Sequence, residues 1–296
     1  SERFVCESCE FVDTFLKLAP DTAILLNIDN DHLDYFKTVD NLIASFHKFC
    51  SMASKEVIAY GDDPKVLKAL CGVEKPVTFY GYSNANEYYP ENIQKHSGIH
   101  TSFDFMQNGR KLGAIDLYVP GRHNVLNAMA AGIAAMHSGS SFEQVRAGLA
   151  AFHGAGRRFE ILGHVNGITV ADDYAHHPTE LRATLTAAKE MHFKRVIAVH
   201  QPFTYSRTKT LLNDFAEVLQ IADITVLSEI MGSREKNIYN IYARDLAEKI
   251  PGCVWFPTFE EIAAHVVSIA GDGDLIITLG CGDVNKCAKM MMEYHR

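Results

Sequence analysis

The sequence predicts an α/β protein of two domains, in which a mixed sheet with helices precedes a mainly parallel, doubly wound sheet. After about residue 160, short apolar runs alternate strictly with helical patterns, which is typical of parallel sheets covered by helices. Between residues 86 and 119, apolar and polar residues alternate around Asn108-Gly109, a strong hairpin signal. Two glycines, at 154 and 156, follow a predicted helix, so we place the domains at 1–153 and 154–296.

The first domain begins with residues 3–7, which predict a strand, and continues with a buried strand at 23–28. Pro64 suits the first turn of a helix that ends near Cys71. The pattern then predicts a helix at 39–52, strands at 56–60 and 77–80, antiparallel strands within 86–119, and helices at 125–137 and 142–152.

Strands and helices alternate along the whole second domain. We expect strands near 168–172, 195–200, 223–228, 253–256 and 274–279, and helices near 179–191, 207–220, 240–250, 258–269 and 283–294. Strands connected through helices lie parallel, so their carboxyl ends meet at one edge of the sheet. Ligands of open α/β sheets bind at this edge.

The composition describes an ordinary globular protein. With 28 Lys and Arg against 36 Asp and Glu, the net charge is −8 and no basic block occurs, which argues against nucleic-acid binding. No apolar run reaches the roughly 20 residues of a membrane span and no signal-peptide pattern opens the chain, so we expect a cytoplasmic protein. Of the seven cysteines, Cys6 and Cys9 form a lone C-x-x-C without the second pair that a zinc site needs.

The stretch from Asp172 to Glu180 is the most polar junction between a predicted strand and a predicted helix. It reads Asp-Asp-Tyr-Ala-His-His-Pro-Thr-Glu, which is too polar for a core. Two more strand ends of this domain carry comparable loops, with Arg207 after one and Gly280-Cys281-Gly282-Asp283 after the other. Arg207 stands near a helix start, where an anion is favoured. We therefore expect a ligand site along this edge.

Two nucleotide-binding signatures are absent from the sequence. The glycines at 280 and 282 lack the third glycine of the dinucleotide fingerprint, which argues against a dehydrogenase. No G-x-x-x-x-G-K-[ST] occurs in the 296 residues, so none of them cradles a triphosphate in the P-loop manner.

In the first domain, acids and a histidine follow predicted strands. Glu7 ends one strand, and Asp31 and His32 follow another. Such groups suit a hard cation shared with substrate phosphates, because Mg²⁺ takes one or two carboxylates besides water and phosphate oxygens. Turn formers and helix caps are the alternative interpretation.

His123, Asn124 and Asn127 stand at the start of one predicted helix, and Arg157 and Arg158 follow the next helix. Asn amides suit the edge of a purine, and an Arg guanidinium suits a phosphate. Caps and solvated charges explain the same residues without a ligand.

Five motifs occur in one order along nearly the whole chain. They are Asn27-Ile28-x-x-Asp31-His32-Leu33-Asp34, Gly121-x-His123-Asn124-x-x-Asn127-x-x-Ala130-Ala131, Arg157-Arg158-Phe159-Glu160, Asp172 to Glu180, and Gln201-Pro202-x-x-Tyr205-Ser206-Arg207-Thr208. In these motifs the chain resembles the Mur ligase family. The double histidine and the Arg-Arg-Phe resemble the branch that joins L-alanine to UDP-N-acetylmuramate.

The resemblance implies a fold, a reaction and a set of site residues. Residues 1–153 would be the later part of a central ATP-binding domain, and residues 154–296 a Rossmann-like ligase domain. ATP would phosphorylate the muramate carboxylate, and L-alanine would attack the acyl phosphate, in peptidoglycan precursor synthesis. Matching positions are Glu7 and His32 for Mg²⁺; Asn124, Asn127, Arg158 and Asp173 for the nucleotide; and His176, Arg207 and Arg158 for catalysis.

The chain departs from the family pattern at two places. Ser45-Phe46 fall where several relatives carry a carbamylated lysine, a residue that the alanine-adding branch also lacks. Phe203-Thr204 replace the more usual His-Arg, so no substrate contact is carried over to these two positions.

Two alternatives remain beside the alanine-adding ligase. One is the recycling ligase that joins a preformed peptide to the same sugar, and the other is a non-catalytic remnant that binds nucleotide or packs against partners. Because the P-loop of the family is missing from residues 1–296, we expect these residues alone to be inactive. We also expect the first domain to expose a sheet edge.

Overall fold

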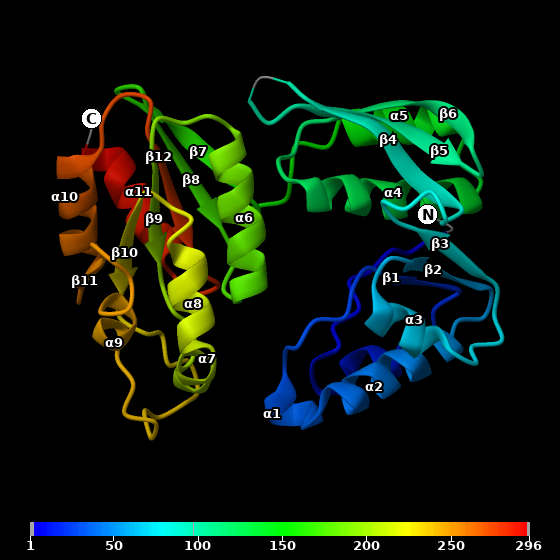
Figure 1. The fold of residues 1–296 in the computed structure, drawn as a ribbon, viewed down its shortest axis with the longest axis horizontal. Helices are drawn as coiled ribbons and strands as arrows, with labels where there is room; N and C mark the ends of the chain where they lie inside the picture. The colour runs from blue at the N-terminus through cyan, green and yellow to red at the C-terminus, as the bar shows by residue number, and fades with distance from the viewer. Residues whose placement is uncertain (1–2, 97, 295–296) are drawn as a thin grey trace. The chain divides into compact units, whose positions relative to one another are not determined.

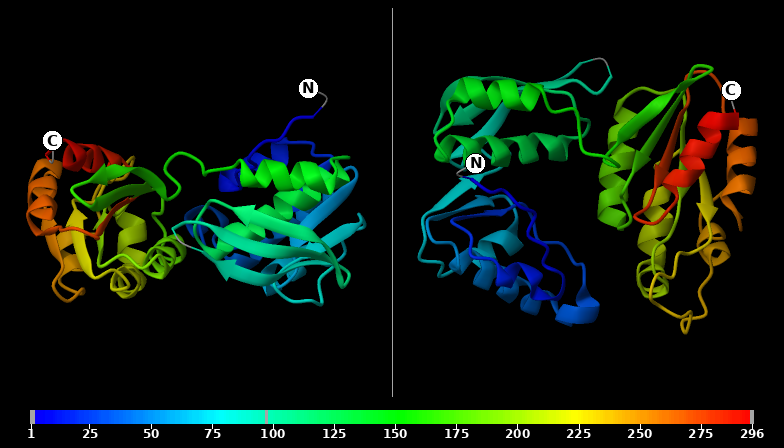
Figure 2. Two further views of the ribbon diagram at one scale, coloured as in Figure 1. Left: turned by 90° about the horizontal axis from the view of Figure 1, so that it is seen from above. Right: turned by 180° about the vertical axis from the view of Figure 1, so that it is seen from behind.

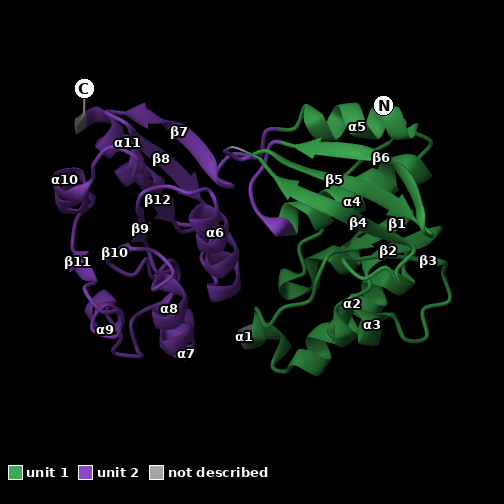
Figure 3. Cartoon of the chain, turned by 45° about the horizontal axis from the view of Figure 1, so that its top comes forward, with its two compact units in different colours: residues 1–96, 100–117, 123–152 green, residues 97–99, 118–122, 153–296 purple. Residues whose placement is uncertain are grey.

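The computed structural model describes residues 3–96 and 98–294, which form two compact units (Figures 1 and 3). The first unit holds residues 1–96, 100–117 and 123–152, and the second holds 97–99, 118–122 and 153–296. Each unit is built on a six-stranded sheet, so the predicted α/β fold is confirmed. Within the described ranges, no helix combines the length and the apolar character that crossing a membrane requires.

The first sheet is mixed, with strand order β1-β2-β3-β4-β5-β6. Neighbours from β1 to β4 pair in parallel, and β4, β5 and β6 form an antiparallel meander that turns at Asn108-Gly109. The strands are β1 (Thr22–Leu25), β2 (Glu56–Tyr60), β3 (Val77–Tyr80), β4 (Tyr88–Lys95), β5 (Thr101–Gln107) and β6 (Arg110–Leu117).

Helices cover this sheet, and their ends carry the caps that the sequence provides. Thr38 accepts a hydrogen bond from the Asn41 amide at 3.1 Å, which starts α2, and Pro64 begins α3 behind the Asp63 cap. Gly132 lets α4 approach Phe105 of β5 and Val145 of α5, since a Cβ there would lie 3.0 Å from the Phe105 ring. The helices are η1 (Phe11–Lys17), α1 (Leu33–Phe36), α2 (Val39–Ser51), α3 (Pro64–Leu70), α4 (Arg122–His137) and α5 (Phe142–Ala150).

The second sheet has strand order β11-β10-β9-β12-β8-β7. All neighbours are parallel except β7, which pairs antiparallel with β8. The last strand of the unit, β12, is therefore inserted between β8 and β9. The strands are β7 (Glu160–Val165), β8 (Ile168–Asp173), β9 (Val196–His200), β10 (Ile224–Ser228), β11 (Val254–Phe256) and β12 (Leu275–Leu279).

Helices cover both faces of the second sheet, as the doubly wound prediction required (Figures 1 and 2). One face packs against α6, α8 and α9 through side chains such as Leu181, Phe215 and Leu246. The other face packs against α10 and α11 through Val266 and Met291. The helices are α6 (Pro178–Glu190), α7 (Tyr205–Thr210), α8 (Leu212–Leu219), α9 (Ala243–Ala247), α10 (Phe259–Ile269) and α11 (Asn285–Tyr294).

Three local predictions were wrong. Residues 3–7 form no strand, because no strand among the described residues pairs with them, and Phe4 and Val5 are 89% and 91% exposed. The helix predicted at 207–220 is two helices that meet at Leu211, and the one predicted at 240–250 is only Ala243–Ala247.

Strand β1 lies at one edge of its sheet, where Ile24 and the following Leu26 are partly exposed.

Candidate functional site

The loops after β8, β12 and β9 lie side by side at the carboxyl edge of the second sheet. Leu279, at the end of β12, pairs in register with Asp173 of β8 and with His200 of β9. The connections leave β8 and β12 toward opposite faces, since α6 and α11 pack on different sides. This is the arrangement in which open α/β sheets bind ligands.

Arg157 joins two of these loops. Its Nε donates to the Asp172 carboxylate at 2.8 Å, and its terminal nitrogens donate to the carbonyls of Gly280 at 2.6 Å and Gly282 at 3.0 Å. The Asp172 side chain is buried and also accepts from the Thr278 hydroxyl. The sequence predicted a phosphate contact for Arg157 or Arg158, and the family resemblance carried a role over only to Arg158; the pairing of Arg157 with Asp172 was not predicted.

The Asp173 carboxylate binds backbone amides of the neighbouring turns. Its two carboxylate oxygens each accept one amide hydrogen, from Phe159 and from Ala175, both at 2.7 Å. Burial raises the pKa of Asp173, and these two amide donors oppose the shift together with the nearby Arg158 charge. The carboxylate thus ties the turn at Arg157 to the end of β8.

The two histidines after β8 have different environments. His176 Nδ1 lies 3.1 Å from the Tyr174 carbonyl oxygen and 3.3 Å from the Glu180 carboxylate, and its ring meets the ring of Phe203 edge-on at 6.1 Å. His177 instead caps α6, since its Nδ1 accepts from the Thr179 amide at 3.4 Å while Glu180 accepts from the His177 amide. The loops of β8 and β9 therefore meet at His176.

Arg207 and Arg158 both belong to this edge. Arg207 lies in α7, which follows the β9 loop. Burial raises the pKa of the Cys281 thiol in the β12 loop to about 11, and the positive charges of Arg207 and Arg157 act in the opposite direction. Arg158 stacks over the Tyr174 ring at 5.4 Å, and Tyr174 in turn meets the His176 ring at 5.6 Å. Two predicted catalytic residues, Arg158 and His176, thus contact the same tyrosine.

His200 is a residue that sequence analysis missed. It ends β9 fully buried, and its Nδ1 lies 3.0 Å from the Leu279 carbonyl oxygen, to which it donates. Its Nε2 has no partner among the described residues. Burial lowers the pKa of His200 to about 4, so the ring is neutral at pH 7. The signal in the sequence was a histidine at the end of an otherwise apolar run.

In the first unit, His32 lies near two acids, but Glu7 is not one of them. His32 Nε2 lies 3.5 Å from the Glu10 carboxylate and 3.7 Å from that of Asp31, and its ring packs against Phe11 at 4.7 Å. Within residues 3–96 and 98–294, Glu7 forms no ion pair with His32. Glu10 is thus a residue that the spacing did not identify.

Asn124 and Asn127 lie one turn apart at the start of α4. The Asn127 amide nitrogen donates to the Asn124 side-chain oxygen at 3.1 Å. Asn124 is half-buried and Asn127 is exposed, so both amides lie on the same accessible side of the helix. The structure therefore brings this predicted pair together.

Comparison with known proteins identifies the family. Residues 2–135 match the Mur ligase middle domain, and residues 157–282 match the Mur ligase, glutamate ligase domain. The chain belongs to the Mur ligase family. This Mur ligase is 42% identical over 299 residues to the UDP-N-acetylmuramate–L-alanine ligase of Agathobacter rectalis, in a match that covers 99% of the chain and 65% of the relative.

Other relatives give the same picture. The UDP-N-acetylmuramate–L-alanine ligase of Caldanaerobacter subterraneus is 38% identical, with 100% of the chain and 66% of the relative covered. The crystal structure of the UDP-N-acetylmuramate–alanine ligase from Thermotoga maritima shares the fold, with a TM-score of 0.78 and 24% identity over 95% of the chain and 61% of that protein. A murein peptide ligase from Psychrobacter arcticus has a TM-score of 0.66 and 27% identity over 95% and 58%. The chain spans about two thirds of the length of its curated relatives.

The donor atoms around His32 fit a hard cation only in part. Carboxylate oxygens such as those of Glu10 and Asp31 are the ligands that Mg²⁺ prefers, whereas imidazole is a softer ligand. Over the described part of this Mur ligase, no three His, Cys, Asp or Glu side chains are arranged as a metal-binding group. A cation here therefore requires further oxygen ligands, as phosphate and water would provide.

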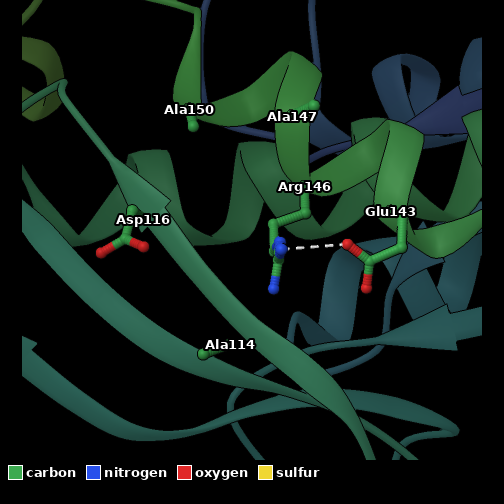
Figure 4. A pocket seen from close by; sticks show the side chains of 6 residues that line it. All are labelled: Ala114, Asp116, Glu143, Arg146, Ala147 and Ala150. Carbon is green, nitrogen blue, oxygen red and sulfur yellow. Dashed lines mark ion pairs between the residues drawn. The ribbon is translucent and has the colours of Figure 1, made fainter.

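Two surface hollows of this Mur ligase lie apart from the predicted residues. One, of about 470 Å³, lies in the first unit beneath α5, where Arg146 reaches Glu143 at 3.0 Å and Asp116 of β6 lies across from them (Figure 4). The other, of about 220 Å³, lies in the second unit beside Gln201, Glu229 and Phe259. Neither includes a residue predicted for nucleotide or catalysis.

Proposed function

We propose that the protein is an ATP-dependent ligase that joins L-alanine to UDP-N-acetylmuramate in peptidoglycan precursor synthesis. The observation that carries this proposal is the 42% identity over 99% of the chain with an enzyme named for that reaction. Two further observations support it: Arg158 and His176 both contact Tyr174 at the ligand edge of the second sheet, and Arg207 lies in the helix that follows the β9 loop at that edge. The absence of a membrane-crossing helix in the described residues agrees with a cytoplasmic enzyme.

The proposed reaction has two steps. A carboxylate oxygen of the muramate attacks the γ-phosphorus of ATP, and the bond to ADP breaks, which gives an acyl phosphate. The amine of L-alanine then attacks the acyl carbon, and the resulting tetrahedral species releases inorganic phosphate. The amine loses a proton as the amide forms. Both steps place negative charge on phosphate oxygens, so cationic groups must surround them.

In the second unit, Arg207 and Arg158 are the residues that supply positive charge. A guanidinium is charged at every physiological pH and binds phosphate through two parallel donors. His176 is the residue that takes the proton from the amine. Its Nδ1 faces the Tyr174 carbonyl oxygen at 3.1 Å, so Nδ1 bears the hydrogen in the neutral ring and Nε2 bears the lone pair.

Asp173 contributes to nucleotide binding through the loop that it holds. Because both carboxylate oxygens accept backbone amide hydrogens, this residue fixes the turn that carries Arg158. Asn124 and Asn127 are the proposed adenine contacts, since two adjacent amides offer both donors and acceptors. We assign residues 1–153 to the ATP-binding domain and residues 154–296 to the ligase domain.

Mg²⁺ is the proposed cation of the first unit. Glu7 and His32 match the family positions for it, and Glu10 and Asp31 are the carboxylates that lie near His32. When bound with ATP, the cation neutralises charge on the transferred phosphoryl group. The chain's own contribution is to hold the partly exposed carboxylates of Glu10 and Asp31 close to His32.

The test is phosphate release with each substrate omitted in turn. Release should require ATP, Mg²⁺, UDP-N-acetylmuramate and L-alanine together in the full-length protein, and His176→Ala should lower kcat by about 100-fold or more. Residues 1–296 prepared alone, without a P-loop, should release no phosphate. If a preformed peptide that begins with L-alanine supports turnover and L-alanine does not, the protein is the recycling ligase instead.

A further inference from the structure

Residues 229–242 follow β10 and form an arm that none of the predicted functions uses. The arm contains Arg234, Glu235 and Lys236, for which the sequence suggests no role. In the structure it packs beside α7, the short helix that carries Arg207. The contacts between the arm and this helix involve Phe203, Tyr205 and Ser206, which directly precede Arg207 in the chain.

Glu235 caps the first turn of α7. Its carboxylate accepts a hydrogen from the Ser206 amide at 2.9 Å and another from the Ser206 hydroxyl at 2.5 Å. The helix has only six residues, and no acid of its own lies in its first turn. Its own N-cap, Thr204, accepts only one amide hydrogen, from Arg207 at 3.4 Å, so the Glu235 carboxylate from a distant segment adds a second cap at the Ser206 amide.

The backbone of the arm is paired with the segment before α7. Met231 donates to the Pro202 carbonyl and accepts from the Thr204 amide, both at 2.9 Å, so Phe203 and Met231 form a parallel bridge. Close packing accompanies this pairing, because a Cβ on Gly232 would lie 2.3 Å from the Tyr205 ring. The arm is therefore joined to the β9 loop by backbone pairing and by close packing.

The residue between this bridge and α7 has an unfavourable conformation. Thr204 has φ 63°, a region that β-branched residues rarely adopt. Its amide donates a hydrogen bond to the Met231 carbonyl at 2.9 Å. Its side-chain oxygen accepts from the Arg207 amide at 3.4 Å, and its carbonyl accepts from the Thr208 hydroxyl at 2.7 Å. The strained backbone conformation of Thr204 persists only while the hydrogen bond to Met231 of the arm is present.

We propose that Glu235 is a positioning residue that acts through Ser206 to aim Arg207 at the substrate. This role of Glu235 rests on the proposed function of Arg207 and extends it, because the orientation of the Arg207 guanidinium selects an anionic substrate group. The Glu235 carboxylate binds the first turn of the helix through Ser206, the residue before Arg207. Its carboxylate keeps the first turn of α7, and hence the Arg207 side chain, in one orientation.

The first test compares Glu235→Ala and Glu235→Gln in the full-length protein. Glu235→Ala should lower kcat/KM by about 10- to 100-fold, since misplacement of a catalytic group by about 1 Å has effects of this size. Its Tm should fall by only about 2–4 °C, the effect of one lost cap. Glu235→Gln retains one acceptor and should recover most of the activity. Glu248→Gln, at an exposed position of the same unit, is the matched control.

The second test separates positioning from stability. In an Arg207→Ala background, Glu235→Ala should cause no further loss of kcat/KM, because the two residues act as one unit. Equal losses in both backgrounds would overturn the proposal. Hydrogen exchange gives a readout that does not depend on ligase activity, since the Ser206 amide should be protected in the wild type and exchange freely in Glu235→Ala. Protection that persists in the variant would overturn the cap, whatever reaction the protein catalyses.

Discussion

At the carboxyl edge of the second sheet, Arg157 lies 2.8 Å from the fully buried Asp172 and also binds two backbone carbonyls. In the first unit, His32 lies 3.5 Å from Glu10, and both side chains are partly exposed. In the first group the acid lies near the end of strand β8, whereas in the second group both residues lie outside strands, Glu10 just before η1 and His32 just before α1. Strand ends can hold charges that are costly to bury, whereas a loop leaves its charges to water and to ligands.

The largest expected effect concerns Arg157. Replacement by Ala leaves the Asp172 carboxylate buried without its partner, so the free energy of unfolding should fall by about 3–5 kcal/mol. Urea unfolding followed by the fluorescence of Trp255 measures this, because the only tryptophan of the chain lies in β11 of the same unit. The double variant Arg157→Ala/Asp172→Asn should recover part of the loss. Arg158→Ala, whose guanidinium forms no such buried pair, should cost less than about 1 kcal/mol.

A smaller effect is expected from His200, which should make the free energy of unfolding depend on pH. Its folded-state pKa of about 4 lies below the ordinary value of 6.5, so the unfolded chain binds the proton more tightly. The contribution of His200 to the free energy of unfolding is fully present above pH 6.5 and is lost as the pH falls from 6.5 through 4. The loss has a limit of about 3 kcal/mol.

Replacement of His200 by Asn tests that slope. The Asn amide can still donate to the Leu279 carbonyl, and it cannot titrate, so the variant should show a flatter stability curve between pH 4 and 6.5. His192→Asn, at an exposed position, is the control. An unchanged slope in His200→Asn would show that other groups cause the acid sensitivity of this unit.

The smallest stability effect is expected in the first unit. Glu10→Gln and Glu7→Gln should each change the free energy of unfolding by less than about 0.5 kcal/mol, because exposed ion pairs contribute little. Both should raise the Mg²⁺ concentration that gives half-maximal activity, Glu10→Gln by about 3- to 10-fold. A titration of activity with Mg²⁺ measures this, and EDTA should abolish turnover. An unaltered Mg²⁺ requirement in both variants would place the cation elsewhere.

Periodic features could be predicted from the sequence. The alternation of apolar runs and helical patterns predicted both sheets, and the polar loops after β8, β9 and β12 were recognised because each follows an apolar run. Their adjacency could not be read from spacing, since β12 enters between two strands that precede it by many residues.

The sequence could not predict which of two similar residues, close together in the chain, makes a given contact. Arg157 and Arg158 are chemically identical, and the positive φ of Arg157 and Phe159 decides which of them reaches Asp172. Glu7 and Glu10 are both acids before η1, and the path of that segment brings Glu10 toward His32. Glu235 meets Ser206 across 29 residues, a separation at which sequence patterns carry no signal.

The central position of β12 also determines the order in which the ligand edge can form on the ribosome. Strands β8 and β9 are synthesised about 75 to 105 residues before the strand that pairs with both of them. Domains generally fold as units during synthesis, so one edge of β8 and one edge of β9 keep unpaired backbone N–H and C=O groups until Leu275–Leu279 emerge. A nascent chain that stalls before this point has neither a complete sheet nor the loop that Arg157 binds, and it presents two open strand edges to chaperones and proteases.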